Sequence, residues 1–217
     1  MQDKHILLKA VETHKIIAIL RGISKDKLIK TAEALYDGGI RLLEITFSAD
    51  GSVSDDDTAE GIAMLCKHFE GRMYIGAGTV LKTSQVFKTA EAGGRFIISP
   101  NTDKAVIEET VRLGLVSMPG ALTPTEVVTA HNYGADFVKL FPVSNMGPDY
   151  VKAVKAPLSH VKLLAVGGVD ENNMKDYLKA GVQGFGLGSN LVDKKLIEKE
   201  DYEGLTLLAK KFTEAIV

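Results

Sequence analysis

The sequence predicts an α/β protein built as a single parallel (β/α)8 barrel, or TIM barrel, with an extra helix at its N-terminus. Short segments with the composition of β-strands recur about every 20 to 30 residues along the 217-residue chain, and a stretch of helical periodicity follows each of them. This alternation is typical of parallel strands linked by helical crossovers. No linker rich in proline, serine or glycine interrupts residues 1–217, so one domain is expected.

The strand segments number eight, which favours a compact closed barrel; an open doubly wound sheet is the structural alternative. They are Ile16–Leu20, Arg41–Thr46, Met73–Gly76, Arg95–Ile98, Val116–Met118, Phe137–Phe141, Val161–Val166 and Gly184–Leu187.

Helical crossovers are expected where apolar residues recur every three or four positions. They include Lys25–Tyr36, Thr58–Phe69, Thr83–Ala92, Asp103–Leu113 and Thr123–Asn132. Several of these stretches end in glycine, which readily adopts the left-handed conformation that stops a helix. The first twelve or so residues are expected to form the additional helix, packed against the lower end of the barrel.

The composition points to small-molecule partners. The formal net charge is −2, so no basic field is available to hold nucleic acid or an anionic membrane surface. The longest apolar runs, such as Ile16–Leu20, are far shorter than the ~20 residues of a membrane helix, and the first ten residues do not resemble a signal peptide. A single cysteine, Cys66, excludes an internal disulfide and is compatible with a reducing cytoplasm.

Neither a metal site nor a cofactor is expected. The five histidines lie in predicted helices or loops away from the strand ends: His5, His14, His68, His131 and His160. The acidic run Asp55–Asp57 is interpreted as a solvated helix start. Cys66 lies in a helical pattern and is interpreted as a buried, unreactive thiol.

Lys139 is placed in the middle of a predicted strand, where strand alternation puts it on the same face as Phe137 and Phe141. An amine desolvated by aromatic neighbours has a pKa below the usual ~10.4, so more of it is nucleophilic near neutral pH. Such an amine can form an iminium with a carbonyl, and the iminium accepts electrons from a neighbouring carbon–carbon bond. The alternative is a structural ion pair inside the barrel.

Glu44 is the ionisable residue of an otherwise apolar strand, on the same face as Leu42 and Thr46. Schiff-base chemistry needs a group that moves protons over about 3 Å, and a glutamate beside an amine can do this through water. The alternative is that Glu44 only neutralises Lys139 or Arg21 in a buried pair. Both interpretations bring these residues together.

Arg21 directly follows the first predicted strand, so it should stand at the mouth of the barrel, where chemistry takes place in this fold. A guanidinium there can bind the carboxylate of a 2-keto acid through paired hydrogen bonds. A solvated surface arginine is the alternative.

Two glycine-rich segments follow the seventh and eighth predicted strands: Gly167-Gly168 and Gly186-Leu-Gly-Ser-Asn190. In (β/α)8 barrels these two loops often hold a phosphate through backbone N–H groups. Simple tight turns are the alternative. A further polar loop, Ser48–Ser54, lies on the same face and is a candidate substrate cover.

Taken in order, these segments resemble the 2-keto-3-deoxy-6-phosphogluconate (KDPG) aldolases and their relatives that cleave 4-hydroxy-2-oxoglutarate. The likeness extends over nearly the whole chain. It rests on Ala18-Ile-Leu-Arg21, Leu43-Glu-Ile-Thr46, Gly76-Ala-Gly-Thr-Val80, Ile98-Ser-Pro100, Met118-Pro-Gly120, Thr123-Pro-Thr-Glu126, Val138-Lys-Leu-Phe-Pro142, Gly167-Gly168 and Gly188-Ser189.

The resemblance implies a class I aldolase domain over residues 1–217, with Lys139 as the Schiff-base residue and Glu44 as general acid and base. It implies cleavage of KDPG to pyruvate and glyceraldehyde 3-phosphate, and of 4-hydroxy-2-oxoglutarate to pyruvate and glyoxylate. A homotrimer without cofactors, working in cytoplasmic Entner–Doudoroff carbohydrate metabolism, is also implied. The implied substrate-binding residues are Arg21, Thr79, Pro100 and Phe141 for the carboxylate and pocket, and Gly167, Gly168, Gly188 and Ser189 for the phosphate.

The chain departs from this pattern at two positions. Many relatives carry an arginine where this chain has Ser48, which leaves Arg21 as the main cation for the carboxylate. Many have a threonine before the paired glycines, where Val166 offers no hydroxyl to the phosphate. Substrate identity is therefore less firmly predicted than the chemistry.

Two other functions fit a barrel with phosphate loops. A sugar-phosphate epimerase would not require Lys139, and such enzymes commonly need strand-end histidines for a metal, which this chain lacks. A non-catalytic barrel that binds a phosphorylated metabolite would use Lys139 and Glu44 as a buried ion pair. That function predicts binding without turnover.

Overall fold

The computed structural model describes residues 2–216 and shows nine parallel strands in one sheet. They are β1 (Ile16–Leu20), β2 (Leu42–Thr46), β3 (Tyr74–Gly78), β4 (Phe96–Ile98), β5 (Val116–Met118), β6 (Gly120–Ala121), β7 (Val138–Leu140), β8 (Leu163–Val166) and β9 (Gly184–Leu187). Their order is β5-β4-β3-β2-β1-β9-β8-β7-β6. Because β5 and β6 follow one another in the chain, the two ends of the sheet meet and the ring closes. The predicted (β/α)8 barrel is confirmed, and the open sheet is not formed.

The fifth predicted strand, Val116–Met118, forms as β5, and a short strand that was not predicted, β6, follows it after Pro119. Proline has no backbone N–H, so it interrupts the ladder on one side. Its carbonyl still accepts a 2.8 Å hydrogen bond from the backbone N–H of Lys139. The interruption therefore leaves the eightfold barrel intact and ties Lys139 to the neighbouring strand.

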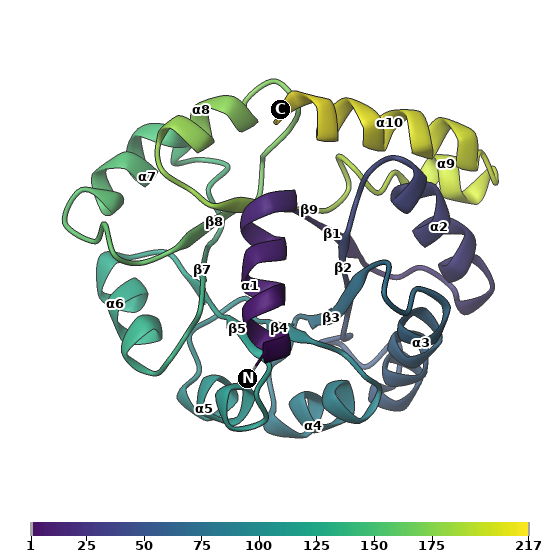
Figure 1. The fold of residues 1–217 in the computed structure, drawn as a ribbon, viewed down its shortest axis with the longest axis horizontal. Coiled ribbons are helices and arrows are strands. Elements are labelled where there is room, and N and C mark those ends of the chain that lie inside the picture. The colour runs from purple at the N-terminus through teal and green to yellow at the C-terminus, as the bar shows by residue number, and fades with distance from the viewer. Residues whose placement is uncertain (1, 217) are drawn as a thin grey trace.

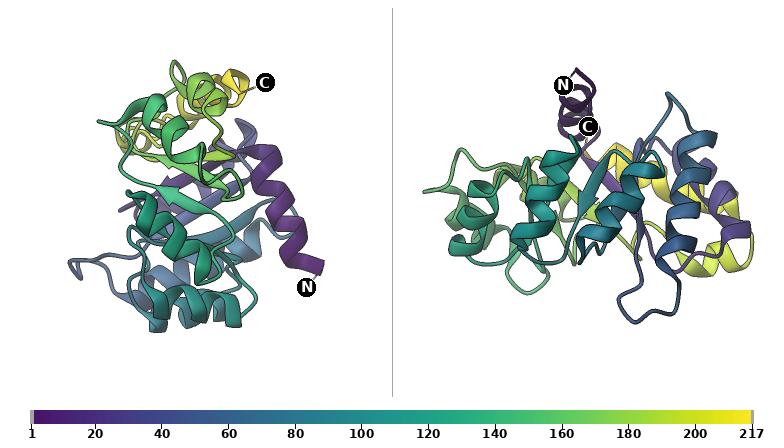
Figure 2. Two further views of the ribbon diagram at one scale, coloured as in Figure 1. Left: turned by 90° about the vertical axis from the view of Figure 1, so that its left-hand side faces the viewer. Right: turned by 90° about the horizontal axis from the view of Figure 1, so that it is seen from below.

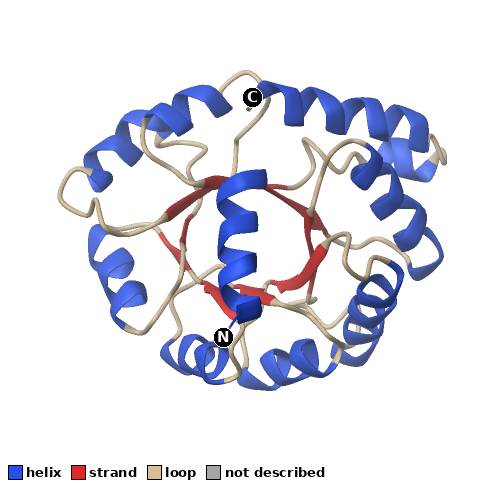
Figure 3. Ribbon diagram, viewed as in Figure 1, coloured by secondary structure: helices blue, strands red, loops and turns tan. Residues whose placement is uncertain are grey.

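Helices surround the strands on the outside of the barrel (Figures 1 and 3). They are α1 (Gln2–His14), α2 (Lys25–Asp37), α3 (Asp55–His68), α4 (Thr83–Glu91), α5 (Lys104–Arg112), α6 (Pro124–Asn132), α7 (Gly147–Lys155), α8 (Met174–Lys179), α9 (Lys194–Glu198) and α10 (Tyr202–Ala215). No helix in residues 2–216 is long and apolar enough to cross a membrane.

Most observed boundaries differ from the predicted ones by a residue or two, and the largest extensions are at the start of α3 and at the end of β3. Helix α3 begins at Asp55 rather than Thr58, because the Ser54 side chain caps it by accepting a 3.0 Å bond from the Asp57 N–H. The acidic run is thus a helix start, as interpreted. Strand β3 continues beyond the predicted end at Gly76 to Gly78, in parallel register with β2. Glycines favour turns in sequence patterns, so this extension was not apparent.

Helix α1 closes the lower end of the barrel, as expected. In Figure 1 it lies across the ring, and Figure 2 shows it at the end opposite the projecting loop between β2 and α3. Leu7 and Val11 of α1 are fully buried against the apolar interior of the strands. Ion pairs Lys4–Asp136 (2.9 Å) and Lys162–Glu12 (2.7 Å) fasten the helix at its two ends. The other end of the barrel remains the open one.

Candidate active site

Lys139 occupies the centre of β7 with its side chain inside the barrel. Val138 and Leu140, on either side, pack into the layer between strands and helices, whereas Phe137 belongs to the inner core. The predicted alternation is therefore correct. Lys139 is only 7% exposed, and its Nζ lies 4.6 Å from the centroid of the Phe141 ring. Burial lowers the pKa of Lys139, while Glu44 opposes this shift.

Glu44 lies at the centre of β2 and is 1% exposed. Burial raises the pKa of its carboxyl from 4.5 to about 7, against the opposing charges of Lys139 and Arg21. Its Oε2 atom has no hydrogen-bond partner in the described residues. A buried carboxyl that titrates near neutrality can both accept and donate a proton, which is what a general acid and base requires.

Strands β2 and β7 stand on opposite sides of the ring, four positions apart in either direction when β5 and β6 count as one strand. Lys139 and Glu44 thus reach toward each other across the barrel interior. Both line a cavity of about 10 Å³, close to the volume that one water molecule needs. The remaining lining residues are apolar or glycine: Ile17, Ile19, Ile98, Leu164, Val166 and Gly186. This dry surrounding explains the pKa shifts of both groups.

The predicted carboxylate-binding residues gather at the mouth of the barrel. Arg21 follows β1, is exposed, and donates a 3.0 Å hydrogen bond from Nη2 to Thr79 Oγ1. Thr79 follows β3 and adopts a left-handed φ of 54°, which is strained for a β-branched residue. The loops after β3 and β4 are joined because Ser99 Oγ donates to the Val80 carbonyl at 2.7 Å. Pro100 therefore lies on the loop next to Thr79.

The predicted phosphate-binding residues occupy two neighbouring loops. Gly167 and Gly168, after β8, have φ values of 94° and 73°, a conformation that favours glycine. Gly188 and Ser189 follow β9, and Asn190 ties the two loops together by donating a 3.0 Å bond to the Val169 carbonyl. Space around Gly188 is open. The two predicted phosphate-binding loops therefore lie side by side at this end of β8 and β9.

Two features of the mouth were missed by sequence reasoning. Lys194 of α9 reaches over to the β1 loop, where its Nζ lies 3.3 Å from the position that a Cβ on Gly22 would take. Lys194 thus adds a second cation beside Arg21. In the sequence, only the position of Lys194 after the β9 loop indicated this. Gly78, at the end of β3, lies directly against Glu44. From the sequence, no role of its own was predicted for this glycine.

The loop from Ser48 to Ser54 lies on this face, as expected. Ser48 Oγ hydrogen-bonds both Asp50 and Ser52, the latter at 2.9 Å, so the loop is held by its own side chains. Together with Arg21, the loop lines a surface cavity of about 290 Å³. Ser48, at the position where many relatives carry an arginine, therefore lines the same cavity as Arg21.

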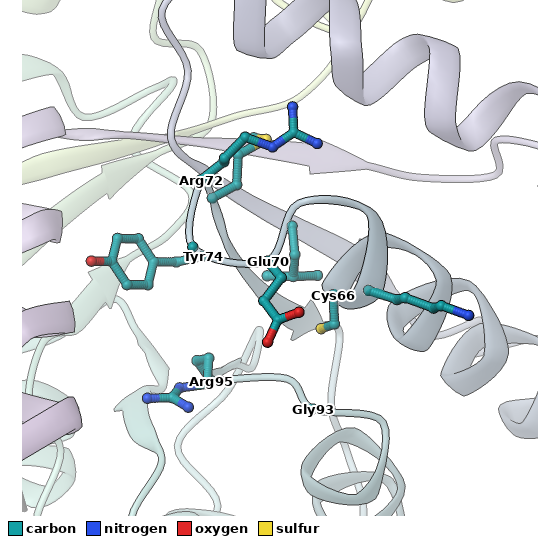
Figure 4. A pocket seen from close by; sticks show the side chains of 10 residues that line it. Cys66, Glu70, Arg72, Tyr74, Gly93 and Arg95 are labelled. Carbon is teal, nitrogen blue, oxygen red and sulfur yellow. The ribbon is translucent and has the colours of Figure 1, made fainter.

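A cavity of about 540 Å³ lies away from this mouth, between the end of α3 and the beginnings of β3 and β4 (Figure 4). Glu70, Arg72 and Arg95 line it, as does Cys66, whose burial raises the pKa of its thiol to about 11. Such a thiol is nearly all protonated at neutral pH, which agrees with the interpretation of Cys66 as unreactive. No group of three potential metal ligands occurs in the described part of the chain.

Comparison with known proteins identifies the family. The family model for KDPG and KHG aldolase matches residues 7–208. A probable 2-dehydro-3-deoxy-6-phosphogalactonate aldolase from Rhizobium meliloti (strain 1021) is 40% identical, over 81% of both chains. The 2-dehydro-3-deoxy-6-phosphogalactonate aldolase of Escherichia coli (strain K12) is 36% identical, over 93% of this chain and 96% of its own.

A solved structure gives the same picture. The KDPG aldolase of Legionella pneumophila, with pyruvate captured at low pH as a covalent carbinolamine intermediate, superposes with a TM-score of 0.84. The match has 26% sequence identity and covers 94% of this chain and 96% of that one. The chain belongs to the KDPG and KHG aldolase family.

Proposed function

We propose that this protein is a class I aldolase that cleaves a 2-keto-3-deoxy-6-phospho sugar acid to pyruvate and glyceraldehyde 3-phosphate. One observation carries the proposal: a buried lysine and a buried glutamate, Lys139 and Glu44, line one small cavity inside an apolar barrel. Perturbed pKa values of this kind concentrate at catalytic sites.

In the proposed first step, the neutral amine of Lys139 adds to the C2 keto carbon of the substrate. The carbinolamine then takes up a proton from solvent on its hydroxyl group, releases that group as water and becomes an iminium. Burial, which lowers the pKa of Lys139, supplies the unprotonated amine near neutral pH. The Phe141 ring, 4.6 Å from Nζ, helps to keep the site dry.

In the second step, the Glu44 carboxylate removes the proton of the C4 hydroxyl, directly or through one water molecule. The electrons of the C3–C4 bond move into the iminium, which releases the aldehyde and leaves an enamine on Lys139. Protonated Glu44 then returns its proton to C3, and water hydrolyses the resulting iminium to pyruvate. A carboxyl with a pKa of about 7 suits both directions of this transfer.

Substrate binding is proposed to divide between the two halves of the mouth. Arg21, held by Thr79, binds the C1 carboxylate beside Pro100. Gly167, Gly168, Gly188 and Ser189 bind the phosphate through backbone N–H groups and one hydroxyl. The carboxylate-binding residues follow β1, β3 and β4, whereas the phosphate-binding residues follow β8 and β9. These two groups of strands occupy different parts of the ring, which supports the division.

Within this substrate class we favour the galactonate form, the C4 epimer of KDPG. The relatives with 40% and 36% identity are named for it, whereas the Legionella enzyme, named for KDPG, has 26%. Initial rates with both epimers and with 4-hydroxy-2-oxoglutarate decide this point. A higher kcat/KM for KDPG would assign the gluconate form instead.

The homotrimer, the cytoplasmic location and a role in Entner–Doudoroff carbohydrate metabolism belong to the same proposal. Exposed apolar side chains on α4 and α5, Phe87 and Val111, offer a surface for contacts between subunits. Light scattering on the purified protein measures the assembly directly.

The mechanism is tested by borohydride reduction in the presence of pyruvate, followed by mass spectrometry. The expected result is a stable adduct on the peptide that carries Lys139, together with loss of activity. An unmodified Lys139 in a protein that stays active would refute the mechanism. Binding of a phosphorylated sugar acid without turnover would instead support a non-catalytic barrel.

A further inference from the structure

Gly78 gives the Glu44 carboxylate the space that it occupies. The two residues lie on neighbouring strands, β2 and β3, whose register pairs Thr46 with Gly78. An ideal Cβ on Gly78 would lie 2.5 Å from Cδ of Glu44, 3.0 Å from Oε2 and closer still to Oε1. Carbon atoms in van der Waals contact are about 3.5–4.0 Å apart. No side chain fits at position 78 unless the carboxylate moves.

The backbone gives no other reason for a glycine here. Gly78 does not adopt the left-handed conformation that favours glycine, whereas the next residue, Thr79, does so despite its side chain. An alanine at position 78 would therefore meet no conformational penalty of that kind. The requirement is for space alone.

The carboxylate has few other places to go. Glu44 is 1% exposed, and its remaining neighbours in the cavity are mostly aliphatic side chains, such as Ile98 and Val166. A carboxylate pushed among them would lose solvation without gaining a hydrogen bond. Proton transfer requires donor and acceptor within about 3 Å, and a displacement of about 1 Å can cost about 10²-fold in rate.

We infer that Gly78 is a positioning residue: its missing side chain sets the Glu44 carboxylate at the place from which it serves the intermediate on Lys139. This inference rests on the proposed aldolase function, and Gly78 acts through Glu44 rather than by touching the reacting atoms. The Gly-x-Gly segment of β3 is then part of the catalytic apparatus and not a turn.

The kinetic test uses Gly78→Ala. We expect kcat to fall about 10²-fold, with KM for the keto acid little changed and the borohydride adduct on Lys139 retained. Glu44→Asp, which withdraws the carboxylate by one methylene, should compensate in the double variant Gly78→Ala/Glu44→Asp. The kcat of the double variant should then exceed the product of the two single effects by about tenfold. Strictly multiplicative losses would overturn the inference.

The stability test does not depend on turnover. Gly78→Ala should lower Tm in the parent protein but not in Glu44→Ala, where the methyl group finds the space empty. Gly186→Ala is the matched control: its methyl would lie 2.9 Å from Cγ2 of Val166 rather than against Glu44, so its effect on Tm should be the same in both backgrounds.

The outcomes separate the two proposals. If Gly78→Ala is equally unstable with and without Glu44, or harmless in both, the inference is wrong. If the parent protein forms no adduct on Lys139 while Gly78→Ala is destabilising only beside Glu44, the contact is real and the proposed aldolase function fails.

Discussion

Ionisable side chains lie at the rim at the lower end of the barrel, whereas they are buried toward the mouth. At the lower end, charges stay at the rim: Lys4 pairs with Asp136, and Arg72 lies against the Phe69 ring, with 4.8 Å from its Cζ to the ring centroid. The 540 Å³ cavity of Figure 4 is lined by such rim residues. Toward the mouth, Lys139 and Glu44 are buried around a cavity of about 10 Å³.

The difference shows that cavity size and reactivity are separate properties. Removing amines and carboxyls from water shifts their pKa values toward neutrality, and this shift makes an amine nucleophilic and a carboxyl amphoteric. At the larger cavity the shifted group is the Cys66 thiol, and burial raises its pKa to about 11, away from neutrality. At the lower end, α1 packs on an apolar interior, and burial of apolar side chains there stabilises the fold.

The largest effect is expected for Lys139→Ala. Without the amine no iminium forms, so kcat/KM should fall by at least about 10⁴-fold, and the borohydride adduct should disappear. The matched control is Lys67→Ala, an exposed lysine at the larger, lower cavity, which should leave kcat/KM unchanged. The measurement is pyruvate release by both variants. A comparable loss in Lys67→Ala would place chemistry at the lower cavity.

The next effect concerns Glu44→Gln and the pH dependence of kcat/KM. Glu44 acts first as a base, and its pKa is about 7, so activity should drop about tenfold for each pH unit below that value. Glutamine cannot titrate. The variant should lose about 10²–10⁴-fold in turnover, and its profile should lose this acidic limb. An unchanged limb in Glu44→Gln would mean that another group titrates.

At the lower end, a core substitution should affect stability and not catalysis. Leu7→Ala removes a 1% exposed side chain of α1 from the inner core, so the free energy of unfolding should fall by about 2–5 kcal/mol. Ile6→Ala, on the 50% exposed neighbour, should change it by less than about 0.5 kcal/mol. Urea unfolding measures both. A folded Leu7→Ala protein with reduced kcat/KM would show that the two ends are coupled.

The difference between local patterns and contacts distant in sequence explains which features the sequence could predict. The β/α alternation was sufficient to predict the barrel, and the alternation of side chains along a strand was sufficient to place Lys139 and Glu44. Both are local patterns. In a closed eightfold ring β2 and β7 stand on opposite sides, so the meeting of Lys139 and Glu44 follows from the predicted barrel. The space at Gly78 and the reach of Lys194 depend on neighbours distant in sequence, so only the structure could reveal them.

The smallest expected effect concerns the phosphate half of the mouth. Ser189 offers one hydroxyl, and Val166, where many relatives carry threonine, offers none. A dianion held there provides binding energy remote from the reacting carbons, so phosphorylated substrate should be favoured. Ser189→Ala should reduce that preference by about 1–3 kcal/mol for a charge-assisted bond, which is about 5–160-fold in kcat/KM.

The preference is measured as the ratio of kcat/KM for KDPG or its C4 epimer to that for the unphosphorylated acid and for 4-hydroxy-2-oxoglutarate. Val166→Thr is the converse variant: a new hydroxyl next to Gly167 should raise the ratio, whereas Ser189→Ala lowers it. Because backbone N–H groups of the β8 and β9 loops remain in both variants, some preference for phosphate should survive each change. Equal kcat/KM values for all these substrates, unaffected by either substitution, would mean that the glycines are only turns and that the natural substrate carries no phosphate.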